Sequence, residues 1–347
     1  MDNHGDPNAL FGPADDDLGP SSDPRNRMPY AAELVIAGSA DGLAMRWTSP
    51  NGALDRAVLD RLDEEMRAAL AAHHEIPSHS PVVVAPREGY SPLVRIRDAA
   101  SDEAPLFLVH PGGGTVLCYR DLAQRLHVPV YGLQAPGLVD GESAIESVET
   151  LASLYLDAII AKQPGGAYRL GGWSFGGVVA FEIARQLQAN GRDVELLAVL
   201  DVHAPGALAA ETWDRDSAHL LVDIFAEDVG VRHDDLHGRS LDEQLDLITR
   251  RAISAGLFPA GFTAAMARRA WDVFQTHRRA ERRYEGGPFA GELLLVTSDS
   301  RSNEADPTLG WTRFADRIIR RSVSGNHQQI LRAPSVEQLA SVLLWTK

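Results

Sequence analysis

From Leu93 to Lys347, short apolar runs alternate with segments of helical periodicity, and this alternation restricts the possible folds more than any other feature. The apolar runs are Leu106–Val109, Val130–Leu133, Tyr168–Gly171, Leu196–Leu200, Glu292–Thr297 and Ile318–Val323. Helices are predicted between or after them, near residues 119–126, 148–161, 175–189 and 335–345. Strands that are apolar throughout are typical of a parallel sheet covered by helices on both faces. The predicted fold class is therefore α/β, with a mostly parallel sheet.

The rest of the chain divides by composition. Residues 206–287 contain no clear strand and are predicted to form several helices inserted into the α/β scheme. Residues 1–29 are rich in Pro, Gly, Asn, Ser and Asp, and we predict that they are disordered. Residues 31–74 are predicted to form a small unit of two strands and one helix. Prolines interrupt residues 75–91, which are predicted to be a linker to the main domain at residues 92–347.

Charge and cysteine content exclude several function classes. The 347 residues include 33 Lys and Arg and 48 Asp and Glu, a net charge of −15, which argues against binding to nucleic acid or to anionic membranes. Cys118 is the single cysteine, so neither an internal disulfide nor a cysteine-based zinc site is expected. No apolar run approaches the roughly 18 residues of a membrane span, and the first residues do not resemble a signal peptide. A soluble, cytoplasmic protein is the expectation.

The segment Gly172-Trp173-Ser174-Phe175-Gly176 matches the pattern G-x-S-x-G between a predicted strand and a predicted helix. In this context the pattern predicts a nucleophile elbow, in which a strained turn exposes the serine and glycines relieve crowding. The preceding Leu170 and Gly171 also fit the phosphopantetheine attachment motif of carrier proteins. There the serine follows a loop, and the glycines after it would have no purpose. We therefore predict that Ser174 is a catalytic nucleophile of an α/β-hydrolase.

A serine nucleophile of this fold needs an acid and a histidine that follow it in the chain. Asp201 and Asp299 each follow a predicted strand beyond the elbow, and either could orient an imidazole. His327 lies in a loop between the last predicted strand and the last helix, where this chain order places the base. The sequence pattern alone leaves the choice between the two aspartates open.

A glycine-rich loop, His110 to Thr115, follows the first apolar run. Esterases of this fold use such a loop to supply one backbone N–H to the oxyanion, and the N–H of the residue after the nucleophile, here Phe175, supplies the other. The loop lacks the Gly-Lys-Ser/Thr of a P-loop and the spacing of a dinucleotide motif, so nucleotide binding is disfavoured.

These motifs together resemble the thioesterase domain that terminates nonribosomal peptide and polyketide synthetases. The resemblance covers residues 93–347 and rests on residues 107–114, 130–137, 171–177, 197–201, 309–311 and 323–327. It implies an α/β-hydrolase fold in which residues 206–287 form a helical lid. It also selects Asp201, which lies 27 residues after Ser174, and places the first oxyanion donor at Gly112, with Gly113 as the alternative.

The resemblance implies a function as well. The expected enzyme transfers an acyl or peptidyl chain from the phosphopantetheine of a carrier protein to Ser174 and releases it to water or to an internal nucleophile, without a metal or redox cofactor. The Trp-Ser-Phe elbow resembles the chain-terminating class. The alternatives are a stand-alone editing thioesterase, an oxoester hydrolase of the same fold and a non-catalytic binding module.

Three further features are interpreted less specifically. Residues 31–74 faintly resemble the end of a condensation domain, through residues 43–47 and 55–70, but the active-site motif His-His-x-x-x-Asp-Gly is absent. His233 and His237 are interpreted as surface histidines because no third metal ligand is evident. A basic cluster is predicted on the last lid helix, either as a solvated face or as a contact for the carrier or its phosphate; it consists of Arg278, Arg279, Arg282 and Arg283.

Overall fold

The computed structural model divides into two units, Met1–Tyr90 and Ser91–Lys347. It describes two strands of the first unit and residues 91–344 of the second, except residues 100–102, 140–141, 209–212, 214, 257 and 259–260. In the first unit, β1 (Glu33–Ser39) and β2 (Gly42–Thr48) pair antiparallel, with Ser39 opposite Gly42. The predicted tail at residues 1–29, the helix at 54–73, the linker up to residue 90 and most of the condensation-like stretch lie outside the described residues.

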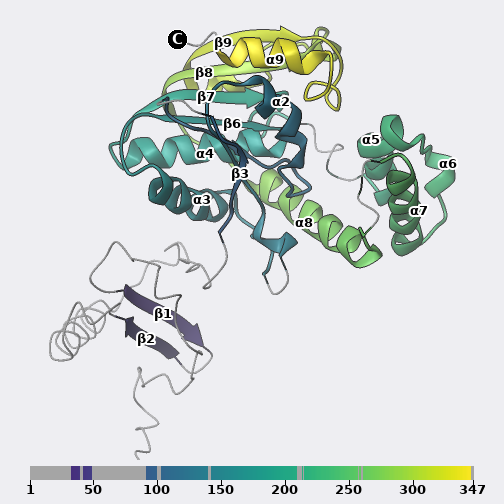
Figure 1. The fold of residues 1–347 in the computed structure, drawn as a ribbon, viewed down its shortest axis with the longest axis horizontal. Coiled ribbons are helices and arrows are strands. Elements are labelled where there is room, and N and C mark those ends of the chain that lie inside the picture. Colours follow the sequence, from purple (N-terminus) through teal and green to yellow (C-terminus); the bar gives the residue numbers. More distant parts are fainter. Residues whose placement is uncertain are drawn as a thin grey trace, which may run out of the picture. The chain divides into compact units, whose positions relative to one another are not determined.

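The second unit is built on a seven-stranded sheet with the order β3-β5-β4-β6-β7-β8-β9 (Figure 1). Only β3 runs antiparallel to its neighbour, β5. The strands are β3 (Leu93–Arg97), β4 (Leu106–Val109), β5 (Val130–Leu133), β6 (Tyr168–Trp173), β7 (Val194–Leu200), β8 (Phe289–Ser298) and β9 (Ala315–Val323). The six apolar runs therefore correspond to β4 through β9, and the mostly parallel α/β sheet is confirmed.

The strand β3 was not predicted. It lies at the edge of the sheet, and its residues are half-buried or exposed, with Arg95 and Arg97 alternating with Val94 and Ile96. A half-buried edge strand has no continuous apolar run, so the pattern that reveals central strands is missing.

Helices cover both faces of the sheet. On one face, α2 (Arg120–Arg125) and α9 (Ser335–Leu344) pack over a core to which β4, β5, β7 and β8 contribute. On the other, α3 (Val148–Lys162) packs beside α4 (Phe175–Ala189), which contacts β4, β6 and β7 (Figure 1). A 3-10 turn at Leu117–Tyr119 precedes α2, so the first predicted helix is shorter than expected.

The predicted helical insertion lies between β7 and β8. It comprises α5 (Ser217–Val229), α6 (His233–Leu236), α7 (Leu241–Ser254) and α8 (Ala264–Arg283). A small apolar cluster of its own joins these helices and includes Leu221, Leu236, Ile248 and Trp271. The long helix α8 also contacts α3 and α4, so it connects the insertion to the body of the domain (Figure 1). None of the described helices is long and apolar enough to cross a membrane.

Candidate active site

Ser174 lies in a strained turn between β6 and α4. Its backbone has φ 57° and ψ −136°, a conformation that residues with a Cβ rarely adopt. The Ser174 N–H donates to the carbonyl of Leu200 in the neighbouring strand β7 at 3.0 Å, and the turn into α4 is closed by the Gly177 N–H, which donates to the Ser174 carbonyl at 2.8 Å. The flanking glycines are sterically required, because a Cβ at Gly172 would lie 2.1 Å from Gly176 backbone atoms and one at Gly176 would lie 2.2 Å from the Val109 carbonyl oxygen. The backbone therefore has the geometry of a nucleophile elbow.

The hydroxyl of Tyr119 joins two strand ends beside this elbow. It donates to the Val109 carbonyl at 2.6 Å and accepts from the Trp173 N–H at 2.8 Å. Tyr119 is fully buried, and burial raises the pKa of its phenol well above the usual value, so the hydroxyl stays neutral and can do both. No sequence motif indicated this role, because the contact joins residues far apart in the chain.

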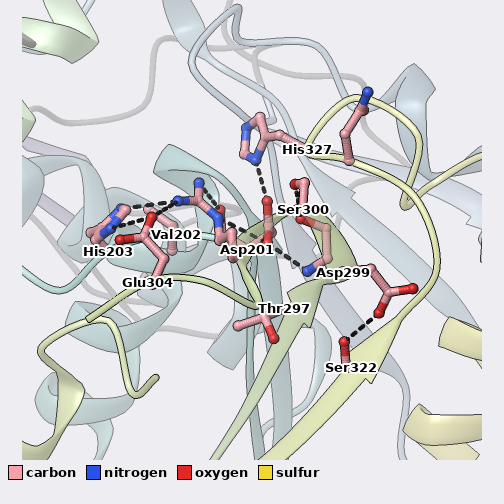
Figure 2. Close-up of polar contacts among 12 residues, drawn as sticks. Asp201, Val202, His203, Thr297, Asp299, Ser300, Glu304, Ser322 and His327 are labelled. Carbon is pink, nitrogen blue, oxygen red and sulfur yellow. Dashed lines mark hydrogen bonds and ion pairs between the residues drawn. The ribbon is translucent and has the colours of Figure 1, made fainter. Parts of the chain in front are cut away.

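Asp201 follows β7 and meets His327 from the loop after β9 (Figure 2). The His327 Nδ1–H donates to Asp201 Oδ2 at 2.7 Å. This assignment of the proton follows from the carboxylate, which can only accept. Asp201 itself is fully buried and has φ 53°, so its side chain is held by a second unusual backbone turn.

The other carboxylate oxygen of Asp201 is held on the opposite side. The Ser298 N–H donates to Oδ1 at 2.7 Å, and Arg301 Nε lies 3.0 Å from the same atom in an ion pair not aligned as a hydrogen bond. Burial alone would raise the pKa of Asp201, but the hydrogen bond from His327 and the charge of Arg301 lower it to about 2. Asp201 is therefore ionised at neutral pH and can hold the imidazole in one tautomer.

The second candidate acid, Asp299, points elsewhere. Its side chain is exposed, and its Oδ1 accepts a hydrogen bond from the Ser322 hydroxyl at 2.8 Å (Figure 2). The structure thus pairs His327 with Asp201 and not with Asp299. Both aspartates end neighbouring parallel strands, which is why the sequence pattern could not separate them.

The imidazole of His327 is about one-third exposed and lies against Trp173, the residue before Ser174, with ring centroids 4.9 Å apart. Because Nδ1 carries the proton, Nε2 is left as an acceptor. Within the part of the chain that the structure describes, Ser174 Oγ makes no hydrogen bond to this imidazole. Such bonds are often long without substrate and shorten when it binds.

The loop after β7 is secured by the Leu309-Gly310-Trp311 motif. Trp311 is fully buried, and its Nε1–H donates to the Val202 carbonyl at 2.9 Å. The Ala204 N–H donates to the Leu309 carbonyl at 2.8 Å. These bonds fix the segment that directly follows Asp201, so this motif supports the site without reaching it.

The glycine-rich loop after β4 forms a turn in which the Gly114 N–H donates to the Pro111 carbonyl at 2.9 Å. A Cβ at Gly112 would lie 2.9 Å from the Phe274 ring of α8, whereas a Cβ at Gly113 would meet nothing within 4 Å. Phe175 is the first residue of α4, so its N–H has no intrahelical partner. The Phe175 N–H directly follows Ser174 in the chain, and the loop starts against the elbow, since a Cβ at Gly176 would lie 2.6 Å from the His110 carbonyl oxygen. Both segments expected to supply oxyanion donors therefore lie near Ser174.

Other candidate residues lie away from this site. In the lid, donor atoms of Asp216, His219 and His233 lie within 4.8 Å of one another, so His233 has neighbours that the sequence did not reveal. Asp216 Oδ1 is already used at the start of α5, where it accepts from the His219 N–H and Nδ1–H at 2.9 and 2.8 Å. Cys118 is half-buried against the core, and burial raises the pKa of its thiol to about 12.

Comparisons with known proteins identify the family of this chain and folds similar to it. The thioesterase domain family model matches residues 104–344. The nonribosomal peptide synthetase apvA of Aspergillus terreus (strain NIH 2624 / FGSC A1156) is 35% identical over 173 residues, which is 48% of this chain and 18% of that synthetase. Atromentin synthetase of Tapinella panuoides is 30% identical over 170 residues, which is 47% of this chain and 18% of that protein. The matched stretch is less than a fifth of the length of each relative.

Two solved structures have a similar fold. The four-domain nonribosomal peptide synthetase holo-AB3403 is 28% identical, with a TM-score of 0.65 over 73% of this chain and 20% of that one. The Vlm2 thioesterase domain is 24% identical, with a TM-score of 0.55 over 72% of this chain and 95% of that one. The predicted α/β-hydrolase fold is thereby confirmed, and the chain belongs to the thioesterase domain family.

Proposed function

We propose that this chain is a serine thioesterase that releases an acyl or peptidyl chain from the phosphopantetheine of a carrier protein. The observation that carries the proposal is the 2.7 Å hydrogen bond between His327 Nδ1 and Asp201 Oδ2, beside the strained elbow of Ser174. Membership of the thioesterase domain family supports the reaction class. The relatives named as nonribosomal peptide synthetases support a place in the biosynthesis of such peptides. A place in polyketide biosynthesis rests on the resemblance of the sequence motifs alone.

In the first half of the reaction, Ser174 Oγ attacks the thioester carbonyl while His327 Nε2 takes the hydroxyl proton. Asp201 stabilises the resulting imidazolium without accepting its proton. The negative charge that develops on the carbonyl oxygen is held by the Phe175 N–H and by an N–H of the loop at Gly112 or Gly113. Collapse of the intermediate breaks the C–S bond, and His327 protonates the departing thiolate, which leaves an acyl-enzyme.

In the second half, a nucleophile attacks the acyl-enzyme and His327 Nε2 removes its proton. Water gives the free acid by hydrolysis, whereas an amine or hydroxyl of the chain itself gives a macrocycle. Ser174 Oγ then leaves and regains its proton from His327. Each step uses side chains and backbone N–H groups of this chain, so the proposed reaction needs no cofactor besides the phosphopantetheine of the substrate.

The proposed partner is an acidic carrier protein, and the basic cluster on α8 is its proposed contact. Within the cluster, Arg278 donates to the Trp213 carbonyl at 3.1 Å and Arg279 lies 3.4 Å from Glu146. Arg282 and Arg283 are exposed at the end of α8. Reversing the charge of both should slow release from a carrier-bound substrate and leave release from free pantetheine thioesters unchanged. If the wild type and the charge-reversed variant released carrier-bound substrate at equal rates, this contact would be removed from the proposal.

The experiment that tests the function is intact-protein mass spectrometry after mixing the chain with acyl and peptidyl pantetheine thioesters, with Ser174→Ala as the control. An acyl adduct on the wild type alone is expected, and the mass of the released product distinguishes acid from ring. Faster turnover of short acyl groups than of peptides would instead indicate an editing thioesterase. Faster turnover of simple esters would indicate an oxoester hydrolase. Failure of a fluorophosphonate to label Ser174 would indicate a non-catalytic binding module.

A further inference from the structure

The lid helix α8 contacts the glycine-rich loop through one buried histidine. His277 is fully buried, and its Nδ1 lies 2.8 Å from the carbonyl oxygen of Gly112. Because a carbonyl oxygen can only accept, Nδ1 carries the proton. Burial lowers the pKa of His277 to about 4, so the ring is neutral at physiological pH and has one N–H to donate. That N–H donates to the loop, while Nε2 is buried and has no hydrogen-bond partner among the described residues.

The ring of His277 also packs against two residues of the site, whose own ring centroids lie 6.1 Å apart. It stacks on Phe175 with centroids 4.7 Å apart and planes at 14°, and on His110 with centroids 4.8 Å apart and planes at 21°. His110 in turn donates from Nδ1 to the Pro111 carbonyl at 2.7 Å and accepts from the Tyr155 hydroxyl at 2.7 Å. A single lid side chain therefore contacts both segments that carry the proposed oxyanion donors.

The hydrogen bond from His277 falls on the central peptide of a four-residue turn in the loop. In the turn from Pro111 to Gly114, the central peptide joins Gly112 and Gly113. Type I and type II turns differ by a flip of this peptide, and type II requires a positive φ at the third residue. Gly113 does not have a positive φ here, whereas Gly114 has φ 84°. Since glycine tolerates both conformations, the sequence of the turn does not select between them.

Flipping this peptide would exchange the groups on its two sides. In a trans peptide the C=O and the N–H point in opposite directions, so the Gly113 N–H lies opposite the Gly112 carbonyl that His277 holds. A Cβ on Gly113 would meet nothing within 4 Å, so open space adjoins this residue. In the flipped turn, a carbonyl oxygen would replace that N–H and would repel an oxyanion.

We propose that His277 is a positioning residue, which selects the turn conformation in which the Gly113 N–H is available to the oxyanion. This inference rests on the proposed function and adds to it a link between the lid helix and the oxyanion site. It also favours Gly113 over Gly112 as the loop donor. When α8 is seated, the hydrogen bond forms and the donor is correctly oriented.

Two substitutions separate the hydrogen bond from the packing. His277→Phe keeps an aromatic ring against His110 and Phe175 but removes the donor. His277→Asn loses the ring but keeps an N–H at the position of Nδ1. We expect His277→Phe to lower kcat on pantetheine thioesters by about 10- to 100-fold, somewhat less than loss of a whole oxyanion donor, with KM within about twofold of the wild type. His277→Asn should recover most of the loss, and His237→Phe, on the exposed side of the lid, should match the wild type.

Two further measurements distinguish positioning from general destabilisation. An alkylboronic acid forms a tetrahedral, negatively charged adduct with the serine, so its affinity should fall in His277→Phe by the same factor as kcat/KM. Hydrogen–deuterium exchange over residues 110–116 should be faster in His277→Phe and near the wild-type rate in His277→Asn. If His277→Phe matches the wild type in kcat, boronate affinity and exchange, or if His277→Asn is as impaired as His277→Phe, the proposal is wrong.

The exchange measurement also separates this proposal from the proposed function. If the wild type turns over no thioester and Ser174 is not acylated, the function is wrong, and exchange over residues 110–116 alone decides on His277. If the wild type is active and only the His277 predictions fail, the thioesterase assignment stands and the link between lid and loop is removed.

Discussion

At the residue scale, the orientation of the imidazole depends on which carboxylate holds it. In Asp201→Asn the side-chain amide can donate to Nδ1, which favours the tautomer with the proton on Nε2 and removes the base. We expect kcat on pantetheine thioesters to fall by about 10³- to 10⁴-fold. Asp299→Asn is the matched control, because Asp299 bonds to Ser322 and not to His327, and it should stay within about twofold of the wild type. A large loss in Asp299→Asn with little change in Asp201→Asn would assign the acid to Asp299.

Arg301 gives the same site a pH-dependent effect on stability. The folded pKa of Asp201 is about 2, below its usual 3.8, so Asp201 contributes stability that is fully present above about pH 4 and is lost as the pH falls towards 2. This lowering of the pKa of Asp201 corresponds to roughly 2 kcal/mol of folding free energy. In Arg301→Met this pKa rises, so the stability is lost at a higher pH.

Acid unfolding followed by circular dichroism should show its midpoint at higher pH in Arg301→Met. Glu304→Gln removes a different partner of Arg301 and should leave the midpoint near that of the wild type; equal midpoints for all three proteins would contradict the role of Arg301.

At the element scale, the elbow requires that β6 and α4 approach without any Cβ between them. Gly172→Ala places a methyl group 2.1 Å from the backbone of Gly176, and neither main chain can move away without breaking the turn. We expect the free energy of unfolding in urea to fall by more than about 3 kcal/mol. Gly165→Ala is the control, because a Cβ there meets nothing within 4 Å, and its unfolding free energy should match or slightly exceed that of the wild type. A stable Gly172→Ala protein would mean that the elbow is not packed as described.

The lid helix α8 carries a carboxyl group whose ionisation opposes folding. Burial raises the pKa of Glu281 to about 7, and the charge of Arg278 only partly offsets this. Since the folded state holds the proton more tightly than the unfolded chain, the contribution of Glu281 to stability is present below about pH 4.5 and is lost as the pH rises through 7. The free energy of unfolding in urea should therefore fall more between pH 5 and pH 8 in the wild type than in Glu281→Gln. Glu285→Gln, at an exposed position just after the end of α8, should lose as much unfolding free energy between the two pH values as the wild type. An equal loss in Glu281→Gln would refute the prediction.

The elements that could be predicted from the sequence are those whose burial leaves a local pattern. The bounds of β4, β5 and α4 coincide with the predicted ones, because continuous apolar runs and the glycine-flanked serine mark them. The edge strand β3 has no such run. The contacts that complete the site could not be predicted, because Tyr119, Arg301 and His277 reach it from distant segments with no spacing in common. Ser174 and His327 carry motifs of their own, whereas the pairing of His327 with Asp201 is a property of the folded sheet.

At the scale of the whole molecule, the described hydrophobic core lies within the second unit. Both apolar clusters, one over the sheet and one in the lid, are built from residues between 94 and 344. The site residues from Pro111 to His327 lie in the same unit, and the family match begins at residue 104. A domain of this size can bury a core sufficient for its own stability. The unit Ser91–Lys347 therefore contains a hydrophobic core of its own and every residue of the proposed chemistry.

The prediction at this scale is that a fragment of residues 91–347 folds and acts alone. Its kcat/KM on pantetheine thioesters should lie within about threefold of the full chain, because no residue of the proposed mechanism is removed. Its thermal unfolding should remain a cooperative transition, measured by calorimetry beside the full chain. An insoluble fragment, or one with less than a tenth of the full chain's activity, would show that residues 1–90 contribute to the fold or to the site. Equal activity on pantetheine thioesters with slower release from a carrier-bound substrate would instead place the role of residues 1–90 in carrier recognition, a step that the small thioesters bypass.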